Sequence, residues 1–116
     1  TIVFVRLVDQ RLGTLLGRAD HRTSSLLIFY ETACAIEHNT NGIVTKGQIL
    51  GHGVAHEIGH LLLASDAHSR VGIMKESYSR DDILTMGQGR LLFSAVESSK
   101  LRERLLSGSE PSAGHR

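Results

Sequence analysis

Two histidines four residues apart, with a glutamate directly after the first, lie inside the longest helical pattern of this chain. The motif reads HEIGH and covers residues 56–60. Its surroundings, residues 46–64, carry apolar side chains at helical spacing, and Thr45 can cap the start of this helix. Side chains four residues apart project from one helix face, about one turn from each other. A helix over residues 46–64 therefore brings the imidazoles of His56 and His60 together on one of its faces.

This spacing predicts a metal site. Two imidazoles one turn apart can both bind one zinc ion at about 2.0–2.1 Å, which makes His56 and His60 candidate ligands. Glu57 is rotated away from them, so it is poorly placed as a ligand but can take a proton from a zinc-bound water. This is the arrangement of a zinc hydrolase with Glu57 as the general base. The alternative is a helix that carries two histidines and a glutamate at its surface.

A catalytic zinc site needs a third protein ligand and keeps one position open. His52 lies one turn before the motif, but three histidines at this spacing span about 12 Å along a helix, too far for one ion. We therefore expect His52 to have a structural role or to support a ligand by a hydrogen bond. Asp66 and His68 follow the predicted end of the helix and are the nearest candidates for the third ligand. Glu76 and Glu97 are further candidates, although Glu97 also fits a helix cap and Glu76 a solvated loop charge.

The remaining patterns predict an α+β fold with a small twisted mixed sheet, an active-site helix and a C-terminal helix. The predicted strands cover residues 1–8, 14–21 and 25–30, and the predicted helices cover 31–38, 46–64, 80–86 and 95–106. The first strand is apolar apart from Arg6, so we expect both of its faces to be buried. Gly17 and Asp20 indicate that the second is an edge strand or carries a bulge. Residues 65–78 are predicted to be a loop, and 107–116 a disordered tail.

Local signals qualify the predicted helices. Capping signatures open the last two, through Ser79 with Asp82 and through Ser94 with Glu97. Three glycines, Gly51, Gly53 and Gly59, lie inside the active-site helix. Each costs about 1 kcal/mol of helix propensity relative to alanine, so we expect packing or close approach to offset them.

Composition limits the class of protein. The 116 residues fit one small domain, and a hydrophobic fraction of 41% argues against wholesale disorder. A net charge of +1 gives no sign of a nucleic-acid partner. The single Cys34 excludes an internal disulfide and a cysteine-rich zinc ribbon, and we expect a small buried thiol. No apolar run is long enough to cross a bilayer. The chain begins at Thr1 without a signal peptide, as a mature product or a fragment would.

The segment HEIGHLLLASDAHSRVGIM, residues 56–74, resembles the zinc signature and Met-turn of the metzincin metallopeptidases. That family reads HExxHxxGxxH, or the same pattern ending in Asp, and residues 72–74 resemble its turn. The likeness is to short bacterial metzincins with the pattern HExxHLLL…HSxxGIM. It implies one catalytic domain over residues 1–106, a bound zinc ion, and endopeptidase activity on peptide or protein substrates. It also implies that Met74 forms an apolar floor under the site, and it allows a secreted or periplasmic location.

The resemblance has departures at the third ligand. The family glycine three residues after the second histidine is Leu63 here. The family's ligand position, six residues after His60, is Asp66, and His68 lies two residues further on. The match of HS followed by GIM favours His68, which would leave Asp66 as a hydrogen-bond acceptor near the site. Tyr78 could stabilise an oxyanion, as a tyrosine near the Met-turn does in some metzincins, but packing or a surface position is the preferred interpretation.

Three further histidines, His21, His38 and His115, lie in strand-edge, turn and tail contexts, where we expect them to be solvated. By resemblance, residues 14–21 form the edge strand to which a substrate adds as a further strand.

Two other hypotheses stay open. The domain could be a catalytically inactive, zinc-stabilised binding or structural module, in which a fourth ligand such as Asp66 closes the site beside His68. A gluzincin with Glu76 or Glu97 as third ligand is the other, and the Met-turn match argues against it.

Overall fold

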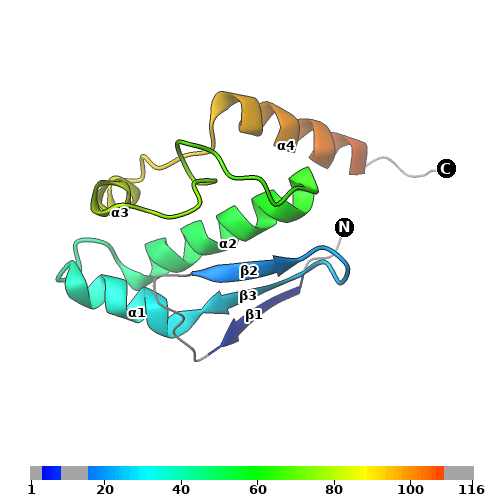
Figure 1. The fold of residues 1–116 in the computed structure, drawn as a ribbon. Coiled ribbons are helices and arrows are strands. Elements are labelled where there is room, and N and C mark those ends of the chain that lie inside the picture. The colour runs from blue at the N-terminus through cyan, green and yellow to red at the C-terminus, as the bar shows by residue number, and fades with distance from the viewer. Residues whose placement is uncertain (1–3, 9–15, 109–116) are drawn as a thin grey trace.

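A three-stranded sheet is followed by four helices in the computed structural model, which describes residues 4–8 and 16–108 (Figure 1). The elements are β1 (Phe4–Val8), β2 (Gly17–Asp20), β3 (Ser25–Phe29), α1 (Tyr30–Asn39), α2 (Lys46–Leu63), α3 (Arg80–Gly87) and α4 (Ala95–Gly108). The α+β class and the order of strands and helices confirm the prediction. Residues 1–3 of the first predicted strand and residues 14 and 15 of the second lie outside the described residues.

The sheet is mixed, with the strand order β1-β3-β2. β1 pairs in parallel with β3, and β2 pairs with β3 in the antiparallel direction. β2 is therefore an edge strand in the part of the chain that the structure describes, as Gly17 and Asp20 indicate. α2 packs against β2 and β3 and crosses one face of the sheet, with α3 and α4 on its other side (Figure 1).

The prediction that the first strand is buried on both faces is wrong. Three of its apolar side chains are well exposed: Phe4 at 64%, Val5 at 50% and Leu7 at 56%. The reason is that β1 lies at an edge of the sheet, whereas α2 packs against β2 and β3. In β3, by contrast, Leu26 and Ile28 are fully buried.

Local capping signals define the helix starts as predicted. The Thr45 side chain accepts a hydrogen bond from the Gln48 backbone, and the Gln48 side chain accepts one from the Thr45 backbone. The same reciprocal pairs open α3 through Ser79 with Asp82 and α4 through Ser94 with Glu97. α4 continues to Gly108, two residues past its predicted end. The rest of the predicted tail, 109–116, lies outside the described residues.

The glycines of α2 fall into two kinds. A Cβ on Gly59 would lie 2.5 Å from Met74 Sδ, and one on Gly53 would lie 3.4 Å from Leu16 Cβ. At these two positions the close approach that we expected is present. A Cβ on Gly51 would meet no atom within 4 Å, so the expectation fails there, because Gly51 faces outward.

α2 ends in a left-handed residue without the help of glycine. Ala64 has φ 50° and ψ 44°, a conformation that costs an L-residue about 1–2 kcal/mol. Two backbone hydrogen bonds close the bend, from Ser65 N to His60 O at 3.2 Å and from Ala64 N to Leu61 O at 3.3 Å. This pair of bonds is the Schellman motif.

In the described part of the chain, no helix has both the length and the apolarity to cross a membrane.

Candidate metal centre

Three histidine side chains meet at the C-terminal half of α2. Nε2 of His60 lies 3.1 Å from Nε2 of His56 and 3.2 Å from Nε2 of His68. One ring nitrogen from each of the three lies within 4.8 Å of the others, close enough to bind one metal ion. Two nitrogen ligands bound tetrahedrally at about 2.0–2.1 Å lie about 3.3–3.4 Å apart, so the two close distances fit a shared ion.

The outer nitrogens of the two helical histidines are held by backbone carbonyls. His56 Nδ1 donates to Ile73 O at 2.6 Å, and His60 Nδ1 donates to Ser65 O at 2.8 Å. A carbonyl only accepts, so the proton of each neutral ring lies on Nδ1 and the Nε2 lone pair is free. Burial lowers the pKa of His56, and the nearby imidazoles add to this, which favours its neutral form. Two such lone pairs facing each other repel, whereas a cation between them binds both.

The third histidine comes from the loop after α2. His68 is exposed, unlike His56 and His60, which are 9% and 6% exposed. The structure brings His68, and not Asp66, to the helical pair. Asp66 Oδ1 accepts a hydrogen bond from His21 Nε2 at 3.0 Å, and its side chain is 91% exposed.

The other candidate ligands have different partners. His52 Nδ1 donates to Gln48 O at 2.8 Å, one turn earlier on α2, which agrees with a structural role. Glu97 caps α4 through the Ser94 backbone. Glu76 lies at the wall of the pocket described below.

Glu57 places a buried carboxylate next to the histidines. It is 6% exposed, and its Oε2 lies 4.0 Å from Nε2 of His56. Burial raises the pKa of Glu57 from its usual 4.5 to about 7, because the charged form loses hydration. A Cβ on Gly17 would lie 3.2 Å from Cγ of Glu57, so the start of β2 lies directly against this side chain. A carboxyl group with this pKa can both take up and release a proton near neutral pH.

The turn around Met74 lies against α2. Met74 is buried, and the Gly59 position leaves room for its sulfur. Ser69 N donates to Met74 O at 2.9 Å, and Ile73 N donates to Leu92 O at 2.9 Å, which fixes both ends of the turn. Gly72 has φ 79°, and a side chain there would collide with the Leu92 carbonyl. These contacts place the Ile73 carbonyl where His56 reaches it.

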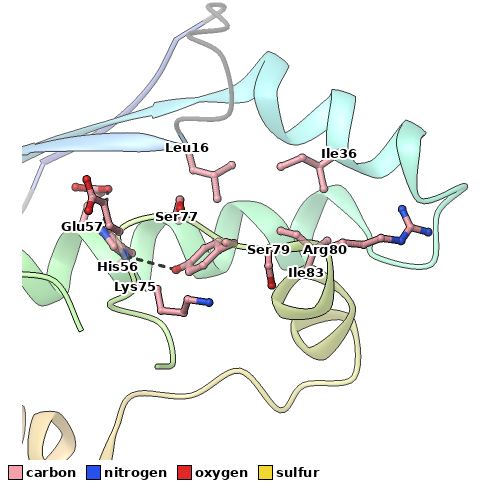
Figure 2. Close-up of a pocket in the computed structure, with 12 residues that line it drawn as sticks. Leu16, Ile36, His56, Glu57, Lys75, Ser77, Ser79, Arg80 and Ile83 are labelled. Carbon is pink, nitrogen blue, oxygen red and sulfur yellow. Dashed lines mark hydrogen bonds and ion pairs between the residues drawn. The ribbon is translucent and has the colours of Figure 1, made fainter. Parts of the chain in front are cut away.

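A pocket of about 340 Å³ opens beside Glu57 and His56. Figure 2 shows these two side chains at one end and Ile36, Ile83 and Arg80 toward the other. Part of its lining is apolar: Leu16, Ile36, Gly53 and Ile83. The rest comes from the loop after Met74 and the first residue of α3: Lys75, Glu76, Ser77, Tyr78, Ser79 and Arg80. The pocket is thus large enough for a side chain of a bound molecule and ends at the candidate metal centre.

Tyr78 packs against the hydrophobic core, as the preferred interpretation has it. Its hydroxyl donates to Ile73 O at 2.5 Å. Burial raises the pKa of the phenol above its usual value, so the hydroxyl keeps its proton. Sequence analysis missed the Ile73 and Ser65 carbonyls, because every residue has a carbonyl and the residue type gives no signal.

Four other predictions concern side chains away from this cluster. Cys34 is half-buried rather than buried. His21 and His38 are both exposed, as expected, and His21 also pairs with Asp66, because the β2–β3 turn reaches the loop after α2. His115 lies outside the described residues.

Comparisons of this chain with protein-family models, with curated protein sequences and with solved structures find no match.

Proposed function

We propose that this chain is a zinc-dependent metalloendopeptidase of the metzincin type that hydrolyses peptide bonds in peptides or proteins. The observation that carries the proposal is the convergence of three imidazole Nε2 atoms next to a buried carboxylate. His56, His60 and His68 would hold the metal, and Glu57 would serve as the general base. A donor set of three imidazoles suits zinc and leaves a fourth position open.

A bound zinc ion would supply a Lewis acid that polarises the scissile carbonyl and makes a water molecule more acidic. Glu57 takes the proton from the attacking water on its carboxylate and transfers it to the nitrogen of the leaving amine. Burial of the Glu57 side chain beside His56 places the carboxylate where such a water would lie. The carbonyls of Ile73 and Ser65 keep Nδ1 of His56 and His60 protonated, so that both Nε2 atoms stay available to the metal.

The edge strand β2 supports an extended substrate. Its described residues pair with β3 on one side, and Gly17 at its start lies against Glu57. A peptide that adds to the free edge of β2 by backbone hydrogen bonds passes the carboxylate. A side chain of such a peptide can enter the pocket between Tyr78 and Ile83.

Asp66 distinguishes an open site from a closed one. A structural zinc site has four protein ligands, and the hypothesis of an inactive module gives the fourth place to Asp66. In the structure the Asp66 carboxylate pairs with His21, away from the three Nε2 atoms. This arrangement favours a site with an open position, which is the catalytic type.

The test compares zinc content and cleavage of an unfolded protein in the wild type, Glu57→Ala and His52→Ala. We expect about one equivalent of zinc in all three, and cleavage reduced about 10²–10⁴-fold only in Glu57→Ala, because that variant lacks the base. Chelator should abolish cleavage by the wild type. Zinc without cleavage in the wild type would support the inactive module, and a wild type without zinc would contradict both functions.

A further inference from the structure

The Ile73 carbonyl accepts two hydrogen bonds. His56 Nδ1 donates to it at 2.6 Å, and the Tyr78 hydroxyl donates to it at 2.5 Å. The Tyr78 hydroxyl also lies 3.5 Å from His56 Nδ1. The two rings stand edge to face, with centroids 6.1 Å apart and an interplanar angle of 87°. Tyr78 thus contacts both the ring of a candidate metal ligand and the group that orients it.

Both partners of this contact are fixed in the structure. The Ile73 amide donates to Leu92 O at 2.9 Å, so Ile73 is held through both its backbone nitrogen and its backbone oxygen. Tyr78 directly precedes Ser79, the N-cap of α3. Asp82 accepts hydrogen bonds from Ser79 and from Lys75, which ties the start of α3 to the residue after Met74. The Tyr78 hydroxyl therefore has a defined position relative to the carbonyl.

We propose that Tyr78 is a positioning residue for the metal centre, which fixes the orientation of His56 through the shared Ile73 carbonyl. Tyr78 does not itself touch the metal position, because its hydroxyl lies on the Nδ1 side of His56 and the three Nε2 atoms meet on the opposite side of the ring. Outer partners of this kind orient a ligand ring, and their loss lowers metal affinity about 10–100-fold. The inference rests on the proposed function, since it takes His56 to be a ligand.

The chain offers a matched control. It has two tyrosines, and the second, Tyr30, lies in α1 next to Lys46, away from the histidines. Tyr78→Phe and Tyr30→Phe remove the same hydroxyl and keep the ring. Zinc affinity is measured for both by competition with a chromophoric chelator. We expect about a tenfold loss in Tyr78→Phe, at the low end of the range because His56 keeps its own hydrogen bond, and no change in Tyr30→Phe. Equal affinity in Tyr78→Phe and wild type would overturn the proposal.

A second measurement on the metal-free protein separates positioning from general stability. Nitrogen-15 NMR follows the Nδ1 protons of His56 and His60 as they exchange with water. We expect faster exchange at His56 alone in Tyr78→Phe, because His60 donates to Ser65 O and not to Ile73 O. Equal acceleration at both rings would overturn the positioning role. If the wild type bound no zinc, the proposed function would fail, and the exchange at His56 would still decide whether Tyr78 orients this ring.

Discussion

The two sides of the candidate metal centre are built differently. On the helix side, His56 and His60 are buried, and each donates Nδ1 to a backbone carbonyl. On the loop side, His68 is exposed, and in the part of the chain that the structure describes no carbonyl accepts from its Nδ1. The difference teaches that the fold already orients two of the three candidate ligands. If a metal binds here, it would have to order the third, and the binding free energy would have to supply that ordering.

The largest effects are expected when one histidine at a time is removed. His56→Ala and His60→Ala should each lower zinc affinity by at least about 100-fold, because each removes one of only three protein ligands of the proposed zinc site. His68→Ala should lose less zinc affinity. The exposed His68 side chain must be ordered when zinc binds, and the cost of this ordering reduces what His68 contributes to the affinity. Chelator competition measures all three, with His52→Ala as the control on the same helix. Equal losses for the three ligands would break the distinction between the two sides.

A second effect follows from burial on the helix side. Burial raises the pKa of Glu57 above its unfolded value of 4.5, to about 7, so the folded state holds this proton more tightly than the unfolded state. In metal-free protein, the stability that this protonation gives is present below pH 4.5 and is lost as the pH rises to about 7. Glu57→Gln should remove this dependence and make the metal-free protein more stable at pH 8, by on the order of 2 kcal/mol after allowance for solvent screening.

Denaturant unfolding at pH 5 and pH 8 measures this change. The control is Glu76→Gln, an exposed glutamate on the pocket wall. If Glu57→Gln and the wild type had the same free energy of unfolding at both pH values, the Glu57 carboxylate would not be buried as the structure indicates.

A third comparison uses one substitution at two positions of α2. Gly59→Ala places a Cβ against Met74 Sδ, and overpacking a buried site costs about 1–3 kcal/mol, which exceeds the gain of about 1 kcal/mol in helix propensity. Gly51→Ala meets no atom within 4 Å and should stabilise the protein by about 0.5–1 kcal/mol. Thermal unfolding should therefore shift in opposite directions. Shifts in the same direction would mean that Met74 does not pack against Gly59.

The smallest effect concerns the bend that joins the two sides. Ala64→Gly relieves a left-handed residue and should stabilise the protein by about 0.5–1 kcal/mol, with zinc affinity within about twofold of the wild type. Thermal unfolding and chelator competition measure the two quantities. Leu63→Gly is the control, because Leu63 is helical and the same change should destabilise there. A stabilised Leu63→Gly would place the bend one residue earlier.

The sequence predicts those parts of the fold that depend on local interactions. The HEIGH motif, the cap at Thr45 and the caps at Ser79 and Ser94 all act within a few residues, and the three helices with these caps start as predicted. α1 has no side-chain cap and starts at Tyr30, one residue earlier than predicted. Burial of β1 depends instead on which helix covers it, and that depends on the sheet order. The same limit applies to Gly51 and Gly59, which look alike in sequence and differ only in what faces them.

The candidate site follows the same rule. The spacing of His56 and His60 is a helical property, so their proximity could be predicted. The choice between Asp66 and His68 depends on the path of the loop after α2, which ends with Asp66 directed to His21. The bend at Ala64 could not be predicted from residue type, because alanine does not favour it.

The way α2 ends has a consequence for the order of folding. His60 and Ser65 are tied twice, through Ser65 N to His60 O and through His60 Nδ1 to Ser65 O. These groups are five residues apart in the chain, whereas His56 and Ile73 are seventeen apart. A short loop closes at lower entropic cost than a long one, and helices form before distant contacts. His60 is therefore oriented as soon as the C-terminal turn of α2 forms. His56 is oriented later, when the Met74 turn packs against α2 and the Ile73 carbonyl accepts its hydrogen bond. We expect zinc supplied during refolding to accelerate only the folding steps that come after the Met74 turn has packed against α2.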